Sequence, residues 1–283
     1  MRWVVTGARG QLGAHLTALL AARDADVHAI GRDGLDITDP AAVDELVGTL
    51  RPDVLVNAAA YTAVDAAESD VEAAHAVNAT GPGLLAQAVA RHGGRMVHVS
   101  TDYVFDGTAT RPYEPSDPTG PRTAYGRTKL AGEQAVLEAL PDRAHVVRTA
   151  WVFGGPTKNF VDTMLRLERE RETVSVVADQ LGSPTWAGDL ATALVALGEL
   201  PEAGPVLHVV NAGQASWCEL ARETFRLAGA DPERVQAIPS SAYPTPAPRP
   251  AWSVLSTAAW DAIAPAPMRP WQDALADCLA RGA

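Results

Sequence analysis

The segment Arg2–Gly13, "RWVVTGARGQLG", decides the fold, because an apolar run leads straight into a loop with glycines at three-residue spacing. A GxxGxxG loop that follows a strand and opens a helix is typical of dinucleotide binding. Gly7 permits a tight turn, Gly10 lets the backbone approach a pyrophosphate, and Gly13 lets the helix pack close to the sheet. The phosphates would then rest on the N-terminus of a helix that we expect from about Gln11 to Arg23.

Apolar runs suited to buried parallel strands recur along the chain. They are "WVVTG", "DVHAIG", "DVLVNAA", "RMVHVS", "HVVRTAW" and "VLHVV". Helical segments lie between them. One begins with Asp39 as its N-cap and Pro40 in its first turn, and another, over 70–94, is interrupted near Gly81-Pro82. Strands alternating with helices over short connections predict an α/β fold, a Rossmann-type doubly wound parallel sheet.

Past residue 150 the alternation loosens, which predicts a smaller C-terminal lobe that binds substrate. We expect a nucleotide-binding Rossmann domain over 1–148, to which 187–210 returns. The substrate lobe would comprise 149–186 and 211–283. Within it, "SSAYPTPAPRPAWS" is either an unstructured linker or an ordered loop over a ligand. The interleaved aromatics and arginine favour the ordered loop.

Composition excludes several classes of partner. The formal charge of −11 over 283 residues argues against nucleic acid or an anionic membrane as the main partner. No apolar run approaches the ~20 residues that cross a bilayer. The two cysteines, Cys218 and Cys278, have no CxxC or metal spacing, so we expect reduced thiols and a cytoplasmic protein.

The segment "RTAYGRTKLAGE" places Tyr125 and Lys129 four residues apart at the expected start of a helix. Such a pair lies on one helix face and usually just faces solvent. About 24 residues earlier, the strand "VSTD" ends in two hydroxyls and an acid. Together the two segments suggest a proton donor at the edge of the sheet.

The residues after the second strand bear on the cofactor. A dinucleotide fold often has an acid there to hold the ribose 2′-hydroxyl, whereas this chain has Gly31 and Arg32. Arginine favours a 2′-phosphate, so we expect NADPH, with NADH possible because Asp33 is adjacent. The alternative is a solvated surface arginine. Asp36-Ile37 would flank the adenine, and the small residues of "NAAAY" would let a cofactor lie against the backbone.

The glycine loop, "NAAA" and Tyr-x-x-x-Lys, in this order, resemble the extended type of the short-chain dehydrogenase/reductase superfamily. The resemblance implies that Tyr125 is the general acid/base and that Lys129 lowers its pKa and holds the nicotinamide ribose. A hydroxyl at the end of "VSTD" would polarise the substrate carbonyl.

The match is closer to one family. "NAAAYTAVDAAE", "STDYVFDGTA", "AYGRTKLAGE", "RTAWVFG", "DQLGSPT" and "SAYPTPAPRPAWSVL" look like the dTDP-4-dehydrorhamnose reductases. This resemblance implies NADPH-dependent reduction of the C4 keto group of dTDP-4-dehydro-L-rhamnose to dTDP-L-rhamnose. The catalytic residues it implies are Thr101, Tyr125 and Lys129. The substrate residues are Val64, Thr101, Asp102, Tyr103 and Trp151. Together with the residues argued above, the expected cofactor contacts are Gly7, Gly10, Gln11, Leu12, Gly13, Arg32, Asp36, Ile37, Ala60, Tyr61, Thr62, Tyr125 and Lys129.

The chain also departs from that family. Some members bind Mg²⁺ between subunits through three glutamates, and His15, Gly188 and Gln272 stand at those positions. These are poor ligands for a hard cation, so we expect no metal and a monomer or weak homodimer rather than a metal-bridged dimer. Trp252 replaces the asparagine usual in "RP-x-N-S", which either reshapes the nucleotide pocket or affects only the loop.

Two alternative functions stay open at this stage. One is a 4-ketoreductase for another dTDP-deoxysugar of secondary metabolism. The other is a non-catalytic, NADP-binding regulatory subunit of the same fold, because a fold and a site can persist without turnover.

Overall fold

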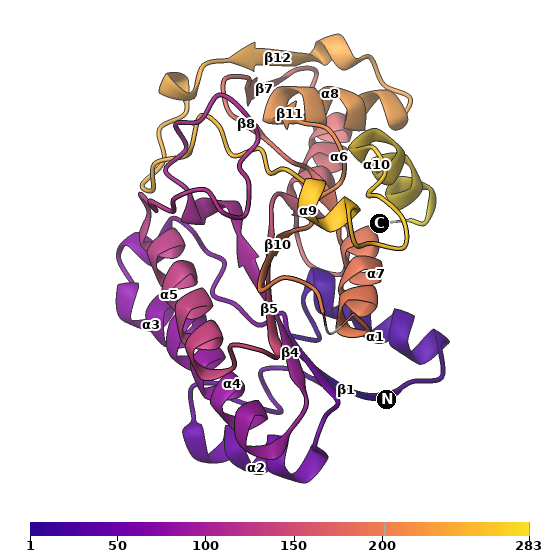
Figure 1. The fold of residues 1–283 in the computed structure, drawn as a ribbon. Helices are drawn as coiled ribbons and strands as arrows, with labels where there is room; N and C mark the ends of the chain where they lie inside the picture. The colour runs from indigo at the N-terminus through magenta and orange to yellow at the C-terminus, as the bar shows by residue number, and fades with distance from the viewer. Residues whose placement is uncertain (201, 283) are drawn as a thin grey trace.

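The computed structural model describes residues 1–200 and 202–282, and its centre is a six-stranded parallel sheet (Figure 1). The strand order is β10-β5-β4-β3-β1-β2. The sheet strands are β1 (Arg2–Thr6), β2 (Asp26–Ile30), β3 (Val54–Asn57), β4 (Arg95–Thr101), β5 (Ala144–Thr149) and β10 (Val206–His208). The six apolar runs therefore form the predicted sheet. The order turns back at β1, and the carboxyl ends of β1 and β3 flank this switch point, where such sheets bind ligands.

Helices cover both faces of the sheet, which confirms the doubly wound prediction (Figure 1). On one face lie α1 (Gln11–Ala22) and α7 (Ala187–Gly198). On the other lie α2 (Pro40–Leu50), α4 (Gly81–His92) and α5 (Ala124–Ala139). Because side chains alternate along a strand, Trp3 and Val5 pack toward the first face and Val4 toward the second.

The helical segment that sequence predicts to be interrupted near Gly81-Pro82 contains a π turn. α3 (Val71–His75) runs into the π turn η2 (Ala76–Thr80) and then into α4. Pro82 has no N–H and would crowd the carbonyl one turn earlier in a regular helix, so widening the turn there accommodates it.

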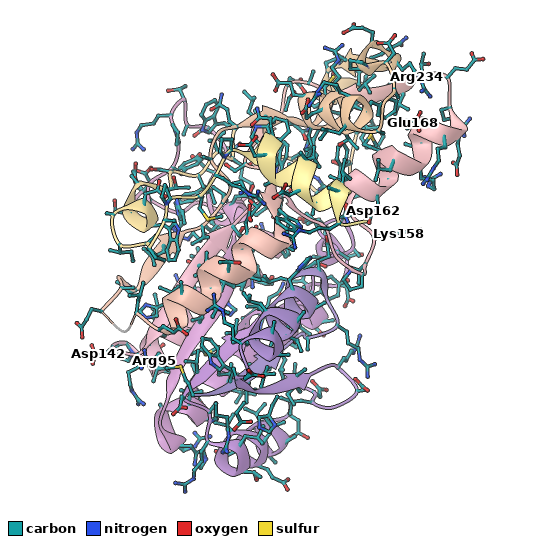
Figure 2. All side chains as sticks on the ribbon, turned by 90° about the vertical axis from the view of Figure 1, so that its right-hand side faces the viewer. Arg95, Asp142, Lys158, Asp162, Glu168 and Arg234 are labelled. Atoms are coloured by element: carbon teal, nitrogen blue, oxygen red, sulfur yellow. The ribbon has the colours of Figure 1, made fainter. Side chains whose placement is uncertain are left out.

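The C-terminal part of the chain forms a second layer of small elements above the sheet in Figure 1. Its helices are α6 (Phe160–Glu170), α8 (Trp217–Leu227), α9 (Ala258–Asp261) and α10 (Trp271–Ala280), and its strand pairs are β6 (Val152–Phe153) with β9 (Thr185–Trp186), β7 (Val174–Val177) with β12 (Val235–Ile238), and β8 (Leu181–Gly182) with β11 (Ala215–Ser216). Short 3₁₀ turns are η1 (Ala66–Glu68), η3 (Asp102–Val104), η4 (Pro232–Arg234) and η5 (Ser240–Ala242). The ion pair between Arg234 and Glu168, at 2.9 Å, ties η4 to α6 (Figure 2). The assignment of this layer as the substrate lobe stays a prediction.

The proline-rich segment 240–253 is ordered and crosses back to the N-terminal part. Arg249 forms a two-pronged ion pair with Asp65, with distances of 2.9 and 2.7 Å, and the Ala247 amide donates to the same carboxylate at 3.1 Å. The linker alternative therefore does not hold, whereas a role over a ligand stays a prediction.

Two sequence expectations concern the surroundings of the protein. No helix within residues 1–200 and 202–282 has the length and apolar content that a membrane crossing requires. Cys218 and Cys278 are both buried and free.

Gly132 on α5 tests how tightly that helix packs against the π turn. A Cβ at Gly132 would lie 2.0 Å from the backbone oxygen of Asn78. We expect Gly132→Ala to lower the free energy of unfolding by about 3 kcal/mol, since backbone atoms cannot yield to an added methyl. The matched control is Gly204→Ala, because a Cβ there meets nothing within 4 Å. Urea denaturation followed by circular dichroism measures both; equal effects would contradict the tight α5 contact.

Candidate active site

Tyr125 lies in the first turn of α5, where local hydrogen bonds fix the start of the helix. Thr123 is the N-cap, and its hydroxyl accepts a hydrogen bond from the Gly126 amide at 3.0 Å. The Glu68 carboxylate accepts from the Ala124 amide at 2.8 Å, so η1 holds the same turn. The phenol of Tyr125 is thereby buried at the carboxyl edge of the sheet.

Thr101 and Lys129 complete a group around Tyr125. Thr101 is the last residue of β4, and its hydroxyl lies close enough to the Tyr125 phenol to act on the pKa of that phenol. Lys129, one turn along α5, is buried and donates from Nζ to the Val99 carbonyl at 2.7 Å. The structure thus brings the three predicted catalytic residues together.

Burial governs the protonation of this group. It raises the pKa of Tyr125 to about 12, with the charge of Asp102 acting in the same direction and the Thr101 hydrogen bond opposing it. It also lowers the pKa of Lys129 to about 8, although the Glu133 carboxylate partly offsets this. The predicted lowering of the Tyr125 pKa by Lys129 is not met in this structure, because the ammonium turns to the Val99 carbonyl.

Behind Lys129 lies a buried ion pair that the sequence analysis did not single out. Arg148 of β5 contacts Glu133 of α5 through two hydrogen bonds, at 3.0 and 2.8 Å. The Ser100 hydroxyl of β4 donates to the same carboxylate at 2.5 Å. Both charged side chains are about 5% exposed or less. Three elements therefore meet at one carboxylate.

The predicted substrate residues Val64, Asp102 and Tyr103 lie near Tyr125. The Tyr103 ring packs edge-on to the Tyr125 ring, with centroids 5.6 Å apart, and Val64 belongs to the same apolar cluster. Asp102 is 3% exposed; its Oδ1 accepts from the Thr101 hydroxyl at 2.9 Å. Burial raises the pKa of Asp102 to about 6, outweighing the lowering influence of the Ser253 and Thr101 hydroxyls.

Trp151, the remaining predicted substrate residue, follows β5 and has a left-handed backbone with φ of 48°. Its indole stacks on that of Trp217, with centroids 3.6 Å apart and planes 7° from parallel. A left-handed non-glycine residue is strained and persists only where packing imposes it. The sequence signal for Trp217 is only the capping box Ser216…Glu219, which places it in the first turn of α8 but does not reveal its partner.

The glycine-rich loop fits a pyrophosphate. Gly7 has φ of 69°, and a Cβ there would lie 2.6 Å from the backbone of Ala58. A Cβ at Gly13 would lie 2.2 Å from the Gly7 oxygen, so the helix packs directly on the loop. Gly10 is the N-cap of α1 and offers no side-chain cap, which leaves first-turn N–H groups to face an anion. The buried Oε1 of Gln11 lacks a hydrogen-bond partner within the described residues.

The other predicted cofactor residues follow β3 and β2. The loop with Ala60, Tyr61 and Thr62 is held by Asn78 of the π turn, whose side chain bonds the Tyr61 amide at 2.8 Å and carbonyl at 3.0 Å. Asp36 accepts from the amide and hydroxyl of Thr38. The side chains of Leu12 and Ile37 are buried in the core, so contacts to a cofactor would use mainly their backbones.

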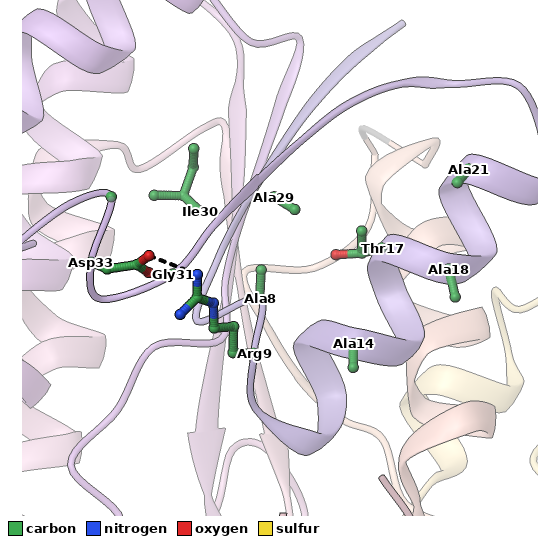
Figure 3. A pocket seen from close by; sticks show the side chains of 11 residues that line it. Ala8, Arg9, Ala14, Thr17, Ala18, Ala21, Ala29, Ile30, Gly31 and Asp33 are labelled. Carbon is green, nitrogen blue, oxygen red and sulfur yellow. Dashed lines mark hydrogen bonds and ion pairs between the residues drawn. The ribbon is translucent and has the colours of Figure 1, made fainter. Parts of the chain in front are cut away.

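Past the end of β2, Arg32 is exposed, and a second arginine pairs with the residue that follows it. Arg9 of the glycine-rich loop pairs with Asp33 at 2.6 Å across Gly31, next to a pocket between α1 and β2 (Figure 3). The sequence pattern around Arg9 predicts no role for it. The Arg9 guanidinium thus lies beside the end of β2, where a 2′-phosphate is expected, and exposed Arg32 follows in the same loop.

Two of the three residues at the family's metal positions lie against Trp186. The His15 ring packs edge-on to Trp186, and a Cβ at Gly188 would lie 2.6 Å from the same ring, while Gln272 is exposed on α10. In the described ranges, 1–200 and 202–282, no three His, Cys, Asp or Glu side chains are grouped for a metal ion. Trp252 donates from its indole N–H to the Arg111 carbonyl at 2.8 Å, so it braces the loop.

The glycine-rich loop, the parallel sheet and the Thr–Tyr–Lys group define the class, an extended short-chain dehydrogenase/reductase. Over residues 1–283 the chain matches the family described as RmlD substrate binding domain, and it belongs to that family.

Several relatives are similar over nearly their whole length. A dTDP-4-dehydrorhamnose reductase of Streptomyces griseus is 53% identical, covering 98% of this chain and 92% of the relative. A probable dTDP-4,6-dihydroxy-2-methyloxan-3-one 4-ketoreductase of Streptomyces antibioticus is 51% identical, covering 99% and 95%. Among solved structures, a dTDP-4-dehydrorhamnose reductase of Bacillus anthracis in complex with NADP has a TM-score of 0.95 at 36% identity, with 99% of each chain covered.

The pKa of Asp102 predicts a pH dependence of stability. Because the folded pKa, about 6, exceeds the ordinary 3.8, the folded state binds this proton more tightly than the unfolded state. The stabilisation is complete below pH ~4 and is lost as pH rises through ~6, at a cost of about 3 kcal/mol. Asp102→Asn stays neutral, so its stability relative to the wild type should rise by about that amount between pH 4 and pH 8. Urea titrations at both pH values measure it, and a constant difference would contradict the raised pKa.

Proposed function

We propose that this protein is an NADPH-dependent oxidoreductase that reduces the C4 keto group of dTDP-4-dehydro-L-rhamnose to give dTDP-L-rhamnose. The observation that carries the proposal is the convergence of Thr101, Tyr125 and Lys129 at the carboxyl edge of a sheet whose first loop fits a pyrophosphate. The names of relatives at about 50% identity over nearly the whole chain support the substrate class, and the NADP-bound relative supports the cofactor.

Each side chain has a role in this reaction. NADPH, when bound, supplies the hydride that reaches the C4 carbon. The Tyr125 phenol, held protonated by burial, gives its proton to the oxygen that gains negative charge. The Thr101 hydroxyl donates a hydrogen bond to the same oxygen. Lys129 holds the nicotinamide ribose, and its positive charge stabilises the phenolate that forms when Tyr125 loses its proton.

The remaining assignments follow from the same proposal. Residues 1–148 with 187–210 bind the cofactor, and 149–186 with 211–283 bind the dTDP-sugar, with Trp151 at their junction. The protein acts in the cytoplasm as a monomer or weak homodimer without a bridging metal.

A second candidate is a 4-ketoreductase for another dTDP-deoxysugar. The Streptomyces antibioticus relative favours it, because its name describes a different keto sugar at similar identity. The regulatory-subunit alternative is less favoured, since the assembled Thr–Tyr–Lys group would serve no purpose in it.

A panel of dTDP-4-keto-6-deoxy sugars, each made by the matching epimerase, distinguishes these functions. We expect NADPH oxidation with the highest kcat/KM for dTDP-4-dehydro-L-rhamnose. A better substrate of other configuration would favour the second candidate, and turnover of none would favour the regulatory subunit.

Substitution of Tyr125 tests the proton donor. Tyr125→Phe removes one hydroxyl, so kcat should fall by ~10²–10⁴ while NADPH affinity and melting temperature stay nearly unchanged. Thr101→Val should cost less, because the proton path remains. Lys129→Met should lower kcat and also weaken NADPH binding, measured by fluorescence titration. Near-normal kcat in Tyr125→Phe would move the donor role to another acid.

The two arginines near β2 test cofactor selection. Arg32→Ala and Arg9→Ala should each raise the KM for NADPH by about tenfold, which corresponds to ~1.4 kcal/mol for a charge-assisted phosphate contact. The KM for NADH should change little. Arg127→Ala is a control, because this exposed arginine lies on the outer side of α5. A similar response of both cofactors would exclude a 2′-phosphate role.

A further inference from the structure

The hydroxyl of Thr101 has one proton and more than one acceptor for it. In the structure it donates to Asp102 Oδ1 at 2.9 Å and accepts from the Tyr103 amide at 3.2 Å. In the proposed reaction the substrate carbonyl needs the same proton. A hydroxyl has one donor and two acceptor sites, so Thr101 cannot donate to Asp102 and to the carbonyl together.

The surroundings of Asp102 disfavour a carboxylate. Its Oδ2 is buried and without a hydrogen-bond partner in the described part of the chain. The groups that face it are the phenols of Tyr125 and Tyr103 and the hydroxyl of Ser253. Arg249 and Asp65, which pair with each other, lie on the side of Tyr103. A buried ionised oxygen without a partner is costly, whereas a carboxyl protonated on Oδ1 leaves Oδ2 uncharged and can donate to Thr101.

We propose that Asp102 is a positioning residue that carries a proton in the reactive complex, donates it to Thr101 Oγ1 and so turns the Thr101 proton toward the substrate carbonyl. Thr101 then accepts from Asp102 and from the Tyr103 amide, which uses both acceptor sites, and its proton is free for the oxygen that gains charge. When Asp102 is ionised, its carboxylate accepts the hydrogen bond of the Thr101 hydroxyl. The substrate carbonyl then has only the Tyr125 phenol as a donor. The inference rests on the proposed function. It gives Asp102 control over the direction in which Thr101 donates, beyond a contact with the substrate.

The pH dependence of the reaction follows from this arrangement. The raised pKa of Asp102 in the free protein is consistent with it. A bound cofactor and substrate exclude more water and raise that pKa further. Since kcat/KM reports the free enzyme and kcat the substrate complex, the alkaline decline due to Asp102 should lie at higher pH in kcat than in kcat/KM.

The test compares pH–rate profiles of the wild type and Asp102→Asn, with NADPH and the best sugar of the panel. Asparagine can donate to Thr101 at every pH. We expect the wild-type kcat to decline by about tenfold as Asp102 ionises, and the variant to lack this decline. An unchanged decline would assign it to Tyr125 and overturn the proposal. A variant as inactive as Tyr125→Phe at every pH would overturn it too, because Asp102 would itself be the proton donor.

Two further variants separate this role from a structural one. Ser253→Ala removes a hydroxyl whose influence lowers the pKa of Asp102, so the decline should move to higher pH. In a Thr101→Val background, adding Asp102→Asn should leave the shape of the profile unchanged, because there is no hydroxyl proton left to direct. A shift to lower pH in Ser253→Ala, or a full effect of Asp102→Asn without the hydroxyl, would contradict the proposal.

A direct titration of Asp102 tests the inference without a measurement of turnover. The carboxyl carbon of Asp102, followed by ¹³C NMR with labelled aspartate and assigned by its absence in Asp102→Asn, should titrate well above the ordinary range. Adding NADP⁺ and dTDP should raise its midpoint further. Titration at an ordinary aspartate pKa would overturn the proposal, whereas absence of turnover with every sugar would contradict the proposed function alone.

Discussion

The buried ion pair between Glu133 and Arg148 is the constraint on which the site depends. It joins α5 to β5, and Ser100 adds β4 to the same carboxylate. Such a pair contributes little net stability against an apolar replacement, but removing one partner leaves a buried charge at a cost of about 3–5 kcal/mol. The pair fixes the orientation of α5 over β4. Tyr125 therefore faces Thr101, and the ammonium of Lys129 reaches the Val99 carbonyl.

Around this fixed helix, burial shifts the pKa of each titratable group of the site toward its neutral form. The pKa of Tyr125 and that of Asp102 are raised, while the pKa of Lys129 is lowered. A reduction consumes a proton at the substrate oxygen, so a site whose burial favours the protonated forms of Tyr125 and Asp102 suits that direction. The same low polarity strengthens each remaining hydrogen bond to a developing charge.

Sequence reasoning succeeded where the determining interactions are local. Apolar runs produce the sheet, Asp39-Pro40 begins α2, and Tyr125 and Lys129 share a face because they stand one turn apart. It did not find the Glu133–Arg148 pair, the Arg9–Asp33 pair or the Trp151–Trp217 stack, because each joins residues far apart in the chain. The pKa of Tyr125 could not be predicted from the sequence either. It depends on the direction of the Lys129 side chain, which is set by where β4 places the Val99 carbonyl.

The π turn at Ala76–Thr80 has a consequence for the angular register of the whole segment from Val71 to His92. Successive residues of an α-helix are turned by about 100° about its axis, so the one extra residue of a π turn offsets everything downstream by about that angle. Leu85 and Val89 point into the sheet core, while upstream Asn78 reaches Tyr61 and Thr128. Deleting a single residue here would turn the π turn into a regular α-helical turn but rotate one of these two faces away from its neighbours. The segment can therefore tolerate substitutions on its surface far more readily than any change in its length.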